Sequence, residues 1–342
     1  MRRLGLAILV MIVGCSSGLD RSDVVATIAG EALIPSIEDA STQIGLLADE
    51  VSEFCSAPGE QALQEAQDQW RLADRAWEGA EVSLYYGPAP MLRTDSKVDF
   101  EPVSPKGIEE LLASHAVIDA DYVDNRSAAS RRGLGAIEYL LFQPLQQAGE
   151  ERRCLLAESA AVVAAAAASE MERAWTEGSE PFHDVFTMTM DSNASLADVV
   201  GAQFEILNRQ TLFELGAALG VTSPEPTLQA IQEGPADAGI DRYLGQLDGI
   251  SDTLNVGGEI SLIELIRSRS DEVAPEIETR LDSAVAGLES VSGSMRQAVV
   301  DEPELMMGVL EDLSVLRDLI HVDVVSLLDL TLGFSDSDGD SG

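Results

Sequence analysis

The chain has 342 residues, and 45% of them are hydrophobic, so it is long enough for one large or two ordinary folded domains rather than a disordered protein. Asp and Glu number 60 against 21 Lys and Arg, which gives a formal net charge of -39. This charge repels nucleic acid and anionic lipid head groups, so we exclude nucleic acid as a partner, whereas cations and basic partners are attracted. The alternative to a role in cation binding is an ordinary solvated acidic surface.

The N-terminal segment has the features of an export signal. Two arginines precede an apolar run over residues 4–13, which is too short to span a bilayer as a stable helix. Residues 1–14 are therefore expected to be a lipoprotein signal peptide, because the run ends in Ile-Val-Gly-Cys, which is typical of a lipobox. Cys15 would then be the lipidated first residue of the mature protein, and residues 15–22 its tether. An ordinary secretory signal is the alternative.

This signal predicts a location as well as a membrane contact. We expect a protein of the cell envelope that is held to the membrane by an N-terminal lipid anchor, on the periplasmic face of the outer membrane if the cell is Gram-negative. In an exported chain, the two remaining cysteines, Cys55 and Cys154, predict one disulfide. Two buried free thiols are the alternative.

The periodicity of apolar residues predicts an all-α fold, because they recur at helical spacing and no convincing strand pattern occurs. The segment Gly178 to Pro181 is the candidate domain boundary, so we expect two helical bundles in series, an N-terminal bundle over residues 23–180 and a C-terminal bundle over residues 181–334. Residues 335–342 form an acidic tail. Helices are expected at about residues 20–54, 60–86, 104–117, 131–142, 151–177, 196–219, 237–254, 261–268, 275–300 and 304–332, with a charged loop over residues 89–103.

The helix RRGLGAIEYLLF at residues 131–142 is the most informative of these. Gly133 and Gly135 each cost roughly 1 kcal/mol relative to alanine inside a helix, so some other group is expected to approach the backbone there. Glu138 follows on the same face among apolar neighbours. A carboxylate in such surroundings needs a proton, a charged partner or a bound cation.

These residues resemble the signature of the imelysin family, GxHxxE, whose last three residues usually begin the run AIEYLL; here that run is residues 136–141. Gly133 and Glu138 match the signature, whereas Gly135 stands where the family has its histidine. The segment QWRLADRAWEGAEVSLYYGP at residues 69–88 is also similar to the family. The resemblance implies a bacterial envelope protein that is linked to iron uptake, in a family first described as peptidases, with a site at the junction of two helical domains.

The candidate site is a carboxylate site for a cation. The resemblance implies that Glu138 is joined by Glu81, from the helix over residues 60–86, and by Asp99 or Asp95 from the charged loop. Oxygen ligands alone favour a hard cation such as calcium, magnesium or ferric iron. The alternative is that the glutamate binds no metal and forms a buried ion pair with one of three arginines, Arg71, Arg93 or Arg209.

Three functions are compatible with these features. The leading hypothesis is an exported imelysin-like lipoprotein that binds iron or another metal for uptake, together with other envelope iron-uptake proteins. The second is an imelysin-fold module that has kept the fold and lost the site. The third is a peptidase, although no catalytic residue can be named, because the three histidines lack the spacing of a zinc peptidase.

Overall fold

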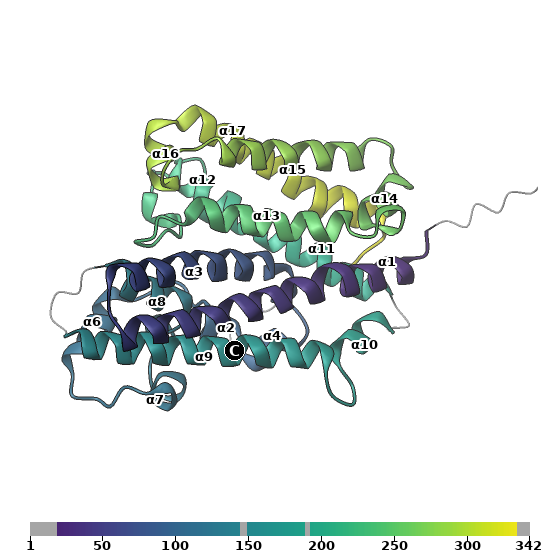
Figure 1. The fold of residues 1–342 in the computed structure, drawn as a ribbon. Helices are drawn as coiled ribbons and strands as arrows, with labels where there is room; N and C mark the ends of the chain where they lie inside the picture. The colour runs from purple at the N-terminus through teal and green to yellow at the C-terminus, as the bar shows by residue number, and fades with distance from the viewer. Residues whose placement is uncertain (1–18, 144–148, 189–191, 334–342) are drawn as a thin grey trace, which may run out of the picture.

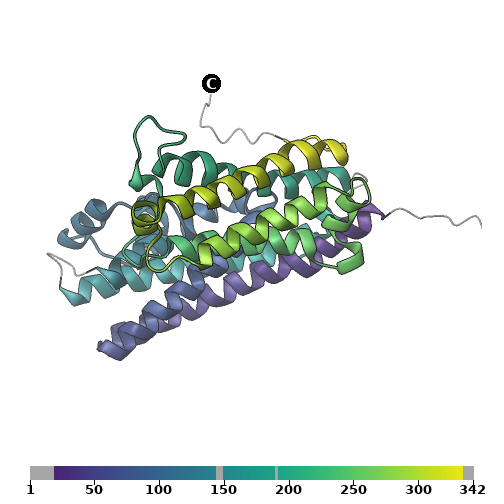
Figure 2. The ribbon, with the colours of Figure 1, turned by 90° about the horizontal axis from the view of Figure 1, so that it is seen from above.

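The computed structural model describes residues 19–143, 149–188 and 192–333, and in these residues the chain is helical, with no strand. The predicted all-α fold is therefore confirmed. Cys15, the signal peptide and the acidic tail lie outside the described residues. The helices are arranged in two stacked layers, and the long helices of both layers run along the same axis (Figures 1 and 2).

The first layer is formed by the N-terminal part of the chain. Its long helices α2, α3 and α9 pack side by side, and α8 lies against α3 and α9. Its elements are α1 Arg21–Ile28, the π-helix η1 Ala29–Leu33, α2 Ile34–Ser56, α3 Glu60–Gly79, the 3-10 helix η2 Glu81–Ser83, α4 Pro88–Leu92, α5 Asp95–Val98, α6 Pro105–Ala113, α7 Ala120–Asn125, the 3-10 helix η3 Ala129–Arg131, α8 Gly133–Phe142, α9 Glu150–Thr176 and α10 Phe182–Thr187.

The second layer follows in the chain and packs on the first mainly through α13. Within it, α15 and α17 form the outer pair of helices. Its elements are α11 Ser192–Asn208, the π-helix η4 Arg209–Glu214, α12 Leu215–Ala218, the 3-10 helix η5 Leu228–Ala230, α13 Gly239–Asn255, the 3-10 helix η6 Gly258–Ile260, α14 Leu262–Arg267, α15 Val273–Glu289, α16 Met295–Asp301, α17 Pro303–Asp318, the π-helix η7 Leu319–Val324 and α18 Val325–Leu327.

A disulfide fixes the first layer. Cys55 near the end of α2 is bonded to Cys154 near the start of α9, with their Cα atoms 5.4 Å apart, so the predicted disulfide is confirmed. The two helices it joins also bury their apolar faces against each other. By length and composition α9 could cross a membrane, but 61% of its apolar stretch is buried inside the protein. Its apolar character is accounted for by its place in the core.

The two layers touch through backbone at the crossing of α3 and α13. A Cβ atom at Gly249 would lie only 2.3 Å from the carbonyl oxygen of Gly79, and one at Gly245 would lie 2.8 Å from that of Arg75. Glycine is required because the helices approach so closely. The same face of α13 carries two polar side chains, Arg242 and Gln246, which therefore contact α3.

Several predicted helix limits were wrong for local reasons. The helix expected at 60–86 ends at Gly79, and the expected loop 89–103 contains the short helices α4 and α5. The helix expected at 275–300 is interrupted, because Gly293 has a φ of +106° and the Ser294 side chain caps α16 by accepting from the Gln297 N–H. Helices α7 and α10 were not predicted at all.

Candidate functional site at the junction of the two layers

The glycines of helix α8 allow a neighbouring segment to lie against it. Gly133 has a φ of +78°, and a Cβ there would lie 2.4 Å from the Val98 carbonyl oxygen. A Cβ at Gly135 would lie 2.3 Å from Val103 Cγ2 and 2.9 Å from Glu101 Oε1. The expected close approach is therefore real. In this chain Val103 and Glu101 fill the space beside the position where the family signature has its histidine.

Glu138 is buried beneath the segment that leads into α13. Its side chain is 4% exposed, and its Oε1 accepts a hydrogen bond of 2.9 Å from the Ala236 N–H. Arg71 Nη2 donates to the carbonyl of the same residue at 2.6 Å. A Cβ at Gly234 would lie 1.9 Å from Glu138 Oε2, so only glycine fits there. Two side chains of the first layer thus hold one residue of the second, Ala236, by its N–H and by its carbonyl.

The charge of Glu138 is not matched by an arginine. Within the described part of the chain it forms no ion pair, so Arg71, Arg93 and Arg209 are not its partners. Burial raises its pKa to about 8, although the nearby Arg242 and the Ala236 N–H act in the opposite direction. At neutral pH the group is therefore mainly protonated, and it can still accept the Ala236 hydrogen bond.

A buried guanidinium, that of Arg242, lies at the centre of the junction. Its Nη2 is 2.9 Å from Asp74 Oδ1, and its Nε is 3.2 Å from Asp74 Oδ2. Three further carboxylates lie around it, with Asp99 at 3.5 Å, Glu101 at 3.7 Å and Glu78 at 3.8 Å. One positive charge is therefore shared among four carboxylates.

Desolvation raises the pKa values of these carboxylates, and repulsion between them adds to the effect. Burial raises the pKa of Asp74 to about 6 and that of Glu101 to about 7, and Arg242 offsets only part of the effect. Burial also raises the pKa of Glu78 well above its usual range and raises that of Asp99. The cluster accordingly holds protons near neutral pH, and a second cation would compete with those protons.

A second arginine reaches the junction from η4. Arg209 binds Glu81 with both of its terminal nitrogens, with Nη2 2.8 Å from Oε2, and Tyr85 donates to Oε1 of the same carboxylate at 3.0 Å. The Nε of Arg209 lies 3.1 Å from Glu214 Oε1, but neither atom completes a well-aligned hydrogen bond. Glu81 is therefore already engaged by a cation of the protein.

Beside Arg209 lies a cavity of about 190 Å³, which we call the junction pocket; three of the carboxylates around Arg242, Glu78, Asp99 and Glu101, also line it. Glu81 and Asp99, two of the predicted ligands, both line it, whereas Glu138 does not. Asp95 lies at the rim of the pocket and is partly open to solvent. Partial desolvation and then repulsion from Asp99 and Glu81 raise the pKa of its carboxyl to about 7, and screening by water reduces this effect. The pocket is lined by five carboxylates, Glu78, Glu81, Asp95, Asp99 and Glu101, together with Trp77, Leu84, Arg209 and Gln232.

No ready-made metal centre accompanies this pocket. Among the residues that the structure describes, no group of three or more His, Cys, Asp or Glu side chains converges closely enough to hold a metal ion. The ligand set of Glu138, Glu81 and Asp99 therefore stays a prediction.

Four residues of the junction were not predicted from the sequence, namely Arg242, Asp74, Glu78 and Glu101. The spacing of Asp74 and Glu78, one helical turn apart beside buried Trp70 and Trp77, was the available signal.

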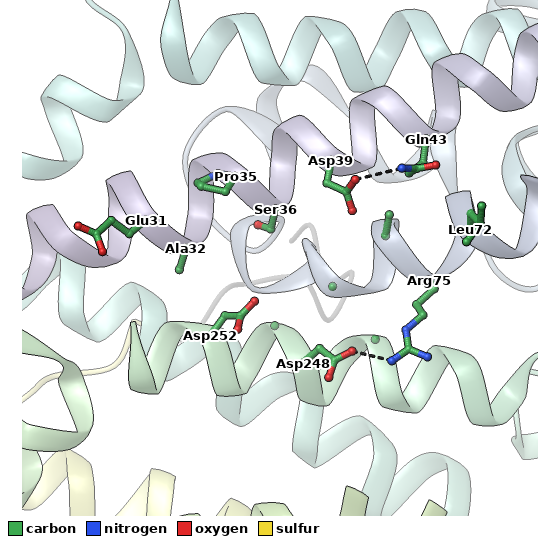
Figure 3. Close-up of a pocket in the computed structure, with 14 residues that line it drawn as sticks. Glu31, Ala32, Pro35, Ser36, Asp39, Gln43, Leu72, Arg75, Asp248 and Asp252 are labelled. Atoms are coloured by element: carbon green, nitrogen blue, oxygen red, sulfur yellow. Dashed lines mark hydrogen bonds and ion pairs between the residues drawn. The ribbon is translucent and has the colours of Figure 1, made fainter. Parts of the chain in front are cut away.

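A second acidic cavity lies elsewhere between the layers. It has a volume of about 370 Å³ and is an open groove among η1, α2, α3 and α13 (Figure 3). Two of its carboxylates already have partners, since Arg75 pairs with Asp248 at 2.8 Å and Gln43 donates to Asp39 at 3.1 Å. Both members of the Arg75 pair are well exposed. The carboxylates of this groove, Glu31, Asp39, Asp248 and Asp252, are exposed residues, unlike the buried Glu78 and Glu81 of the junction pocket.

Comparison with known proteins places the chain in a family. The sequence profile of the imelysin family matches residues 33–318, which is most of the chain. The protein therefore belongs to the imelysin family, and the resemblance seen in the sequence is confirmed.

Individual relatives are distant in sequence. The iron-regulated protein A of Synechococcus elongatus is 26% identical over 152 residues, which is 44% of this chain and 40% of that protein. The crystal structure of an imelysin-like protein from Psychrobacter arcticum 273-4 matches with a TM-score of 0.77 at 19% identity, over 93% of this chain and 99% of the other. A Parabacteroides distasonis protein, assigned as an iron-regulated protein A precursor, has a TM-score of 0.76 at 17% identity, over 92% and 97%. These two structures share its fold.

Proposed function

We propose that this protein is a lipid-anchored component of the bacterial cell envelope that binds a metal cargo for iron or metal uptake. The binding site is the junction pocket. Family membership supports the proposal, as do the names of two relatives, which connect this fold with iron regulation. Its other partners would be envelope proteins of the same uptake process. Basic patches on those proteins would be attracted to this strongly acidic chain.

The observation that carries the proposal is the crowding of five carboxylates around a cavity of about 190 Å³. Burial raises the pKa of Asp95 and that of Glu101 to about 7, and Arg209 and Arg242 offset only part of this effect. A cation that enters the pocket replaces those protons and gains oxygen ligands, which hard cations such as ferric iron or calcium prefer.

Equilibrium dialysis followed by elemental analysis tests this function. The chain from residue 15 onward, purified with Cys15→Ser so that it carries no lipid, is dialysed against ferric, ferrous, zinc and calcium salts and against ferric nitrilotriacetate. We expect about one metal per chain in the wild type, and loss of it in Asp95→Asn/Asp99→Asn.

A matched control separates the pocket from the general charge of the surface. Asp248→Asn/Asp252→Asn makes the same change of charge in the groove of Figure 3 and is expected to retain the metal. Equal loss in both double variants would show that only diffuse attraction is at work and would contradict the proposal.

A second function is favoured by one observation. Arg242 already provides a cation within 4.0 Å of four carboxylates, and Val103 with Glu101 occupies the space beside Gly135. The chain could thus be an imelysin-fold module that binds no metal. Absence of bound metal from the wild type in every dialysis would establish this second function. The peptidase hypothesis has no comparable observation in its favour.

The proposed location is tested separately. Wild-type protein is expected in the membrane fraction after cell disruption, and Cys15→Ser in the unbound fraction, because only the cysteine can accept the lipid. Equal partition of the two proteins would contradict the lipid anchor.

A further inference from the structure

The junction pocket continues into a wider cavity. This outer cavity, which we call the vestibule, has a volume of about 450 Å³. It shares Glu81, Leu84, Asp95 and Arg209 with the junction pocket, so the two spaces meet at these residues. Together they are much larger than a single metal ion requires.

The two spaces differ in charge. Glu78, Asp99 and Glu101 line only the junction pocket, whereas Arg93 lines only the vestibule. Across the described residues, Arg93 forms no ion pair, and it lies at the exposed end of helix α4. It adopts a left-handed conformation with a φ of +56°, which is uncommon for a residue other than glycine. A positive, uncommitted side chain is thus held over the outer cavity.

The vestibule also has an apolar wall. Leu84, Ala89 and Pro90 line it together with the ring of Tyr85, whose hydroxyl is bound to Glu81. Such a surface packs against carbon atoms and offers nothing to a hydrated metal ion. The outer cavity therefore fits an organic group that bears a negative charge.

The coordination chemistry of the junction pocket points in the same direction. A metal ion without other ligands needs several oxygen or nitrogen donors around it, commonly six or more for hard cations. Among the described side chains no three carboxylates converge on one point, and Glu81 is already held by Arg209. A cargo that brings some of its own donors needs fewer from the protein.

We propose that the cargo is a metal ion already bound by a small, carboxylate-bearing chelator. The metal faces Asp95 and Asp99, and a carboxylate of the chelator faces Arg93 while its carbon skeleton lies on the apolar wall of the vestibule. This inference rests on the proposed function and deepens it. In the binding step the two aspartates take two coordination positions of the metal, two water molecules leave, and any proton on an aspartate passes to solvent.

Isothermal titration calorimetry with four probes tests the inference. Ferric nitrilotriacetate is a chelate with two open positions, iron-free nitrilotriacetate is the chelator alone, hexaamminecobalt(III) is a trication whose ammonia ligands do not exchange, and calcium chloride supplies a bare hard cation. Wild-type protein is expected to bind ferric nitrilotriacetate at least about tenfold more tightly than any other probe. Arg93→Asn is expected to weaken this binding about tenfold, and asparagine tolerates the left-handed conformation, so the fold is preserved.

The control is Arg75→Asn, which removes the same charge beside the groove of Figure 3 and is expected to leave the affinity within about twofold of the wild type. Two outcomes would overturn the chelate inference alone. In the first, wild-type protein binds calcium or hexaamminecobalt(III) as tightly as it binds ferric nitrilotriacetate. In the second, Arg93→Asn binds ferric nitrilotriacetate with the affinity of the wild type. Absence of binding for every metal probe in the wild type overturns the proposed function as well.

Discussion

Removal of the buried cation at the junction is the sharpest test of the electrostatic account. Arg242→Leu leaves Asp74, Glu78, Asp99 and Glu101 without the guanidinium that lies 2.9 to 3.8 Å from them. Loss of one member of a buried ion pair costs about 3–5 kcal/mol, because the charge that remains is buried without a partner. We therefore expect the free energy of unfolding at pH 8 to fall by about that amount.

The same variant should show a characteristic pH dependence. Carboxylates whose pKa is raised by folding bind protons more tightly in the native state, so stability falls as the pH rises through that pKa. Asp74 and Glu101 already have pKa values of about 6 and 7 with Arg242 present. Without it these values rise further, so the loss of stability is expected to be large at pH 8 and much smaller at pH 5, where the carboxyls are neutral.

Urea unfolding followed by circular dichroism at pH 5 and pH 8 measures both effects. The control is Arg75→Leu, whose ion pair with Asp248 is 43% and 54% exposed and is expected to contribute at most about 1 kcal/mol at either pH. A loss below about 1 kcal/mol for Arg242→Leu at pH 8, or an equal loss at both values, would refute the reasoning.

Three other substitutions are informative. Glu138→Gln should be more stable than the wild type above pH 8, and it should lack the wild type's decline of stability between about pH 4.5 and pH 8. At 1.36 kcal/mol per pKa unit, the pKa of about 8 sets an upper bound of about 5 kcal/mol for this difference. Urea unfolding at several pH values measures it, and equal stability of the two proteins would show that the carboxyl is not desolvated. Cys55→Ala/Cys154→Ala should lose about 2–4 kcal/mol in urea unfolding, since the disulfide closes a loop of 99 residues, and an unchanged midpoint would contradict this. Gly135→His should lower the free energy of unfolding by about 1–3 kcal/mol in thermal unfolding, because its Cβ would clash with the Val103 side chain. Addition of Val103→Ala to this variant should restore part of the lost stability. No recovery would show that the strain lies elsewhere.

The sequence was sufficient for the architecture and for one linkage. Helical periodicity predicted the all-α fold, and the even pair Cys55 and Cys154 predicted the disulfide, because both depend on patterns that are local or countable. The glycines of the signature helix correctly predicted a close approach to its backbone. The helix limits near Gly79 and Gly293 were not predicted. The sequence contains many glycines, and only the packing of the two layers determines at which of them a helix ends.

The site was predicted only in part. Glu81 and Asp99 do line one pocket, and Glu138 is buried at the junction as expected. The partner of that glutamate could not be predicted, because it is the backbone N–H of Ala236, about a hundred residues away in the chain. Arg242 was missed for the same reason, since only the crossing of α3 and α13 brings it to the carboxylates.

Anomalous diffraction tests the central claim most directly, because it locates the metal itself. Crystals of the wild-type chain soaked with ferric nitrilotriacetate and measured at the iron edge should show one anomalous peak in the junction pocket, within coordination distance of carboxylate oxygens of Asp95 or Asp99. The peak should be absent from Asp95→Asn/Asp99→Asn. A wild-type crystal with an empty junction pocket, or with iron only in the groove of Figure 3, would contradict the account.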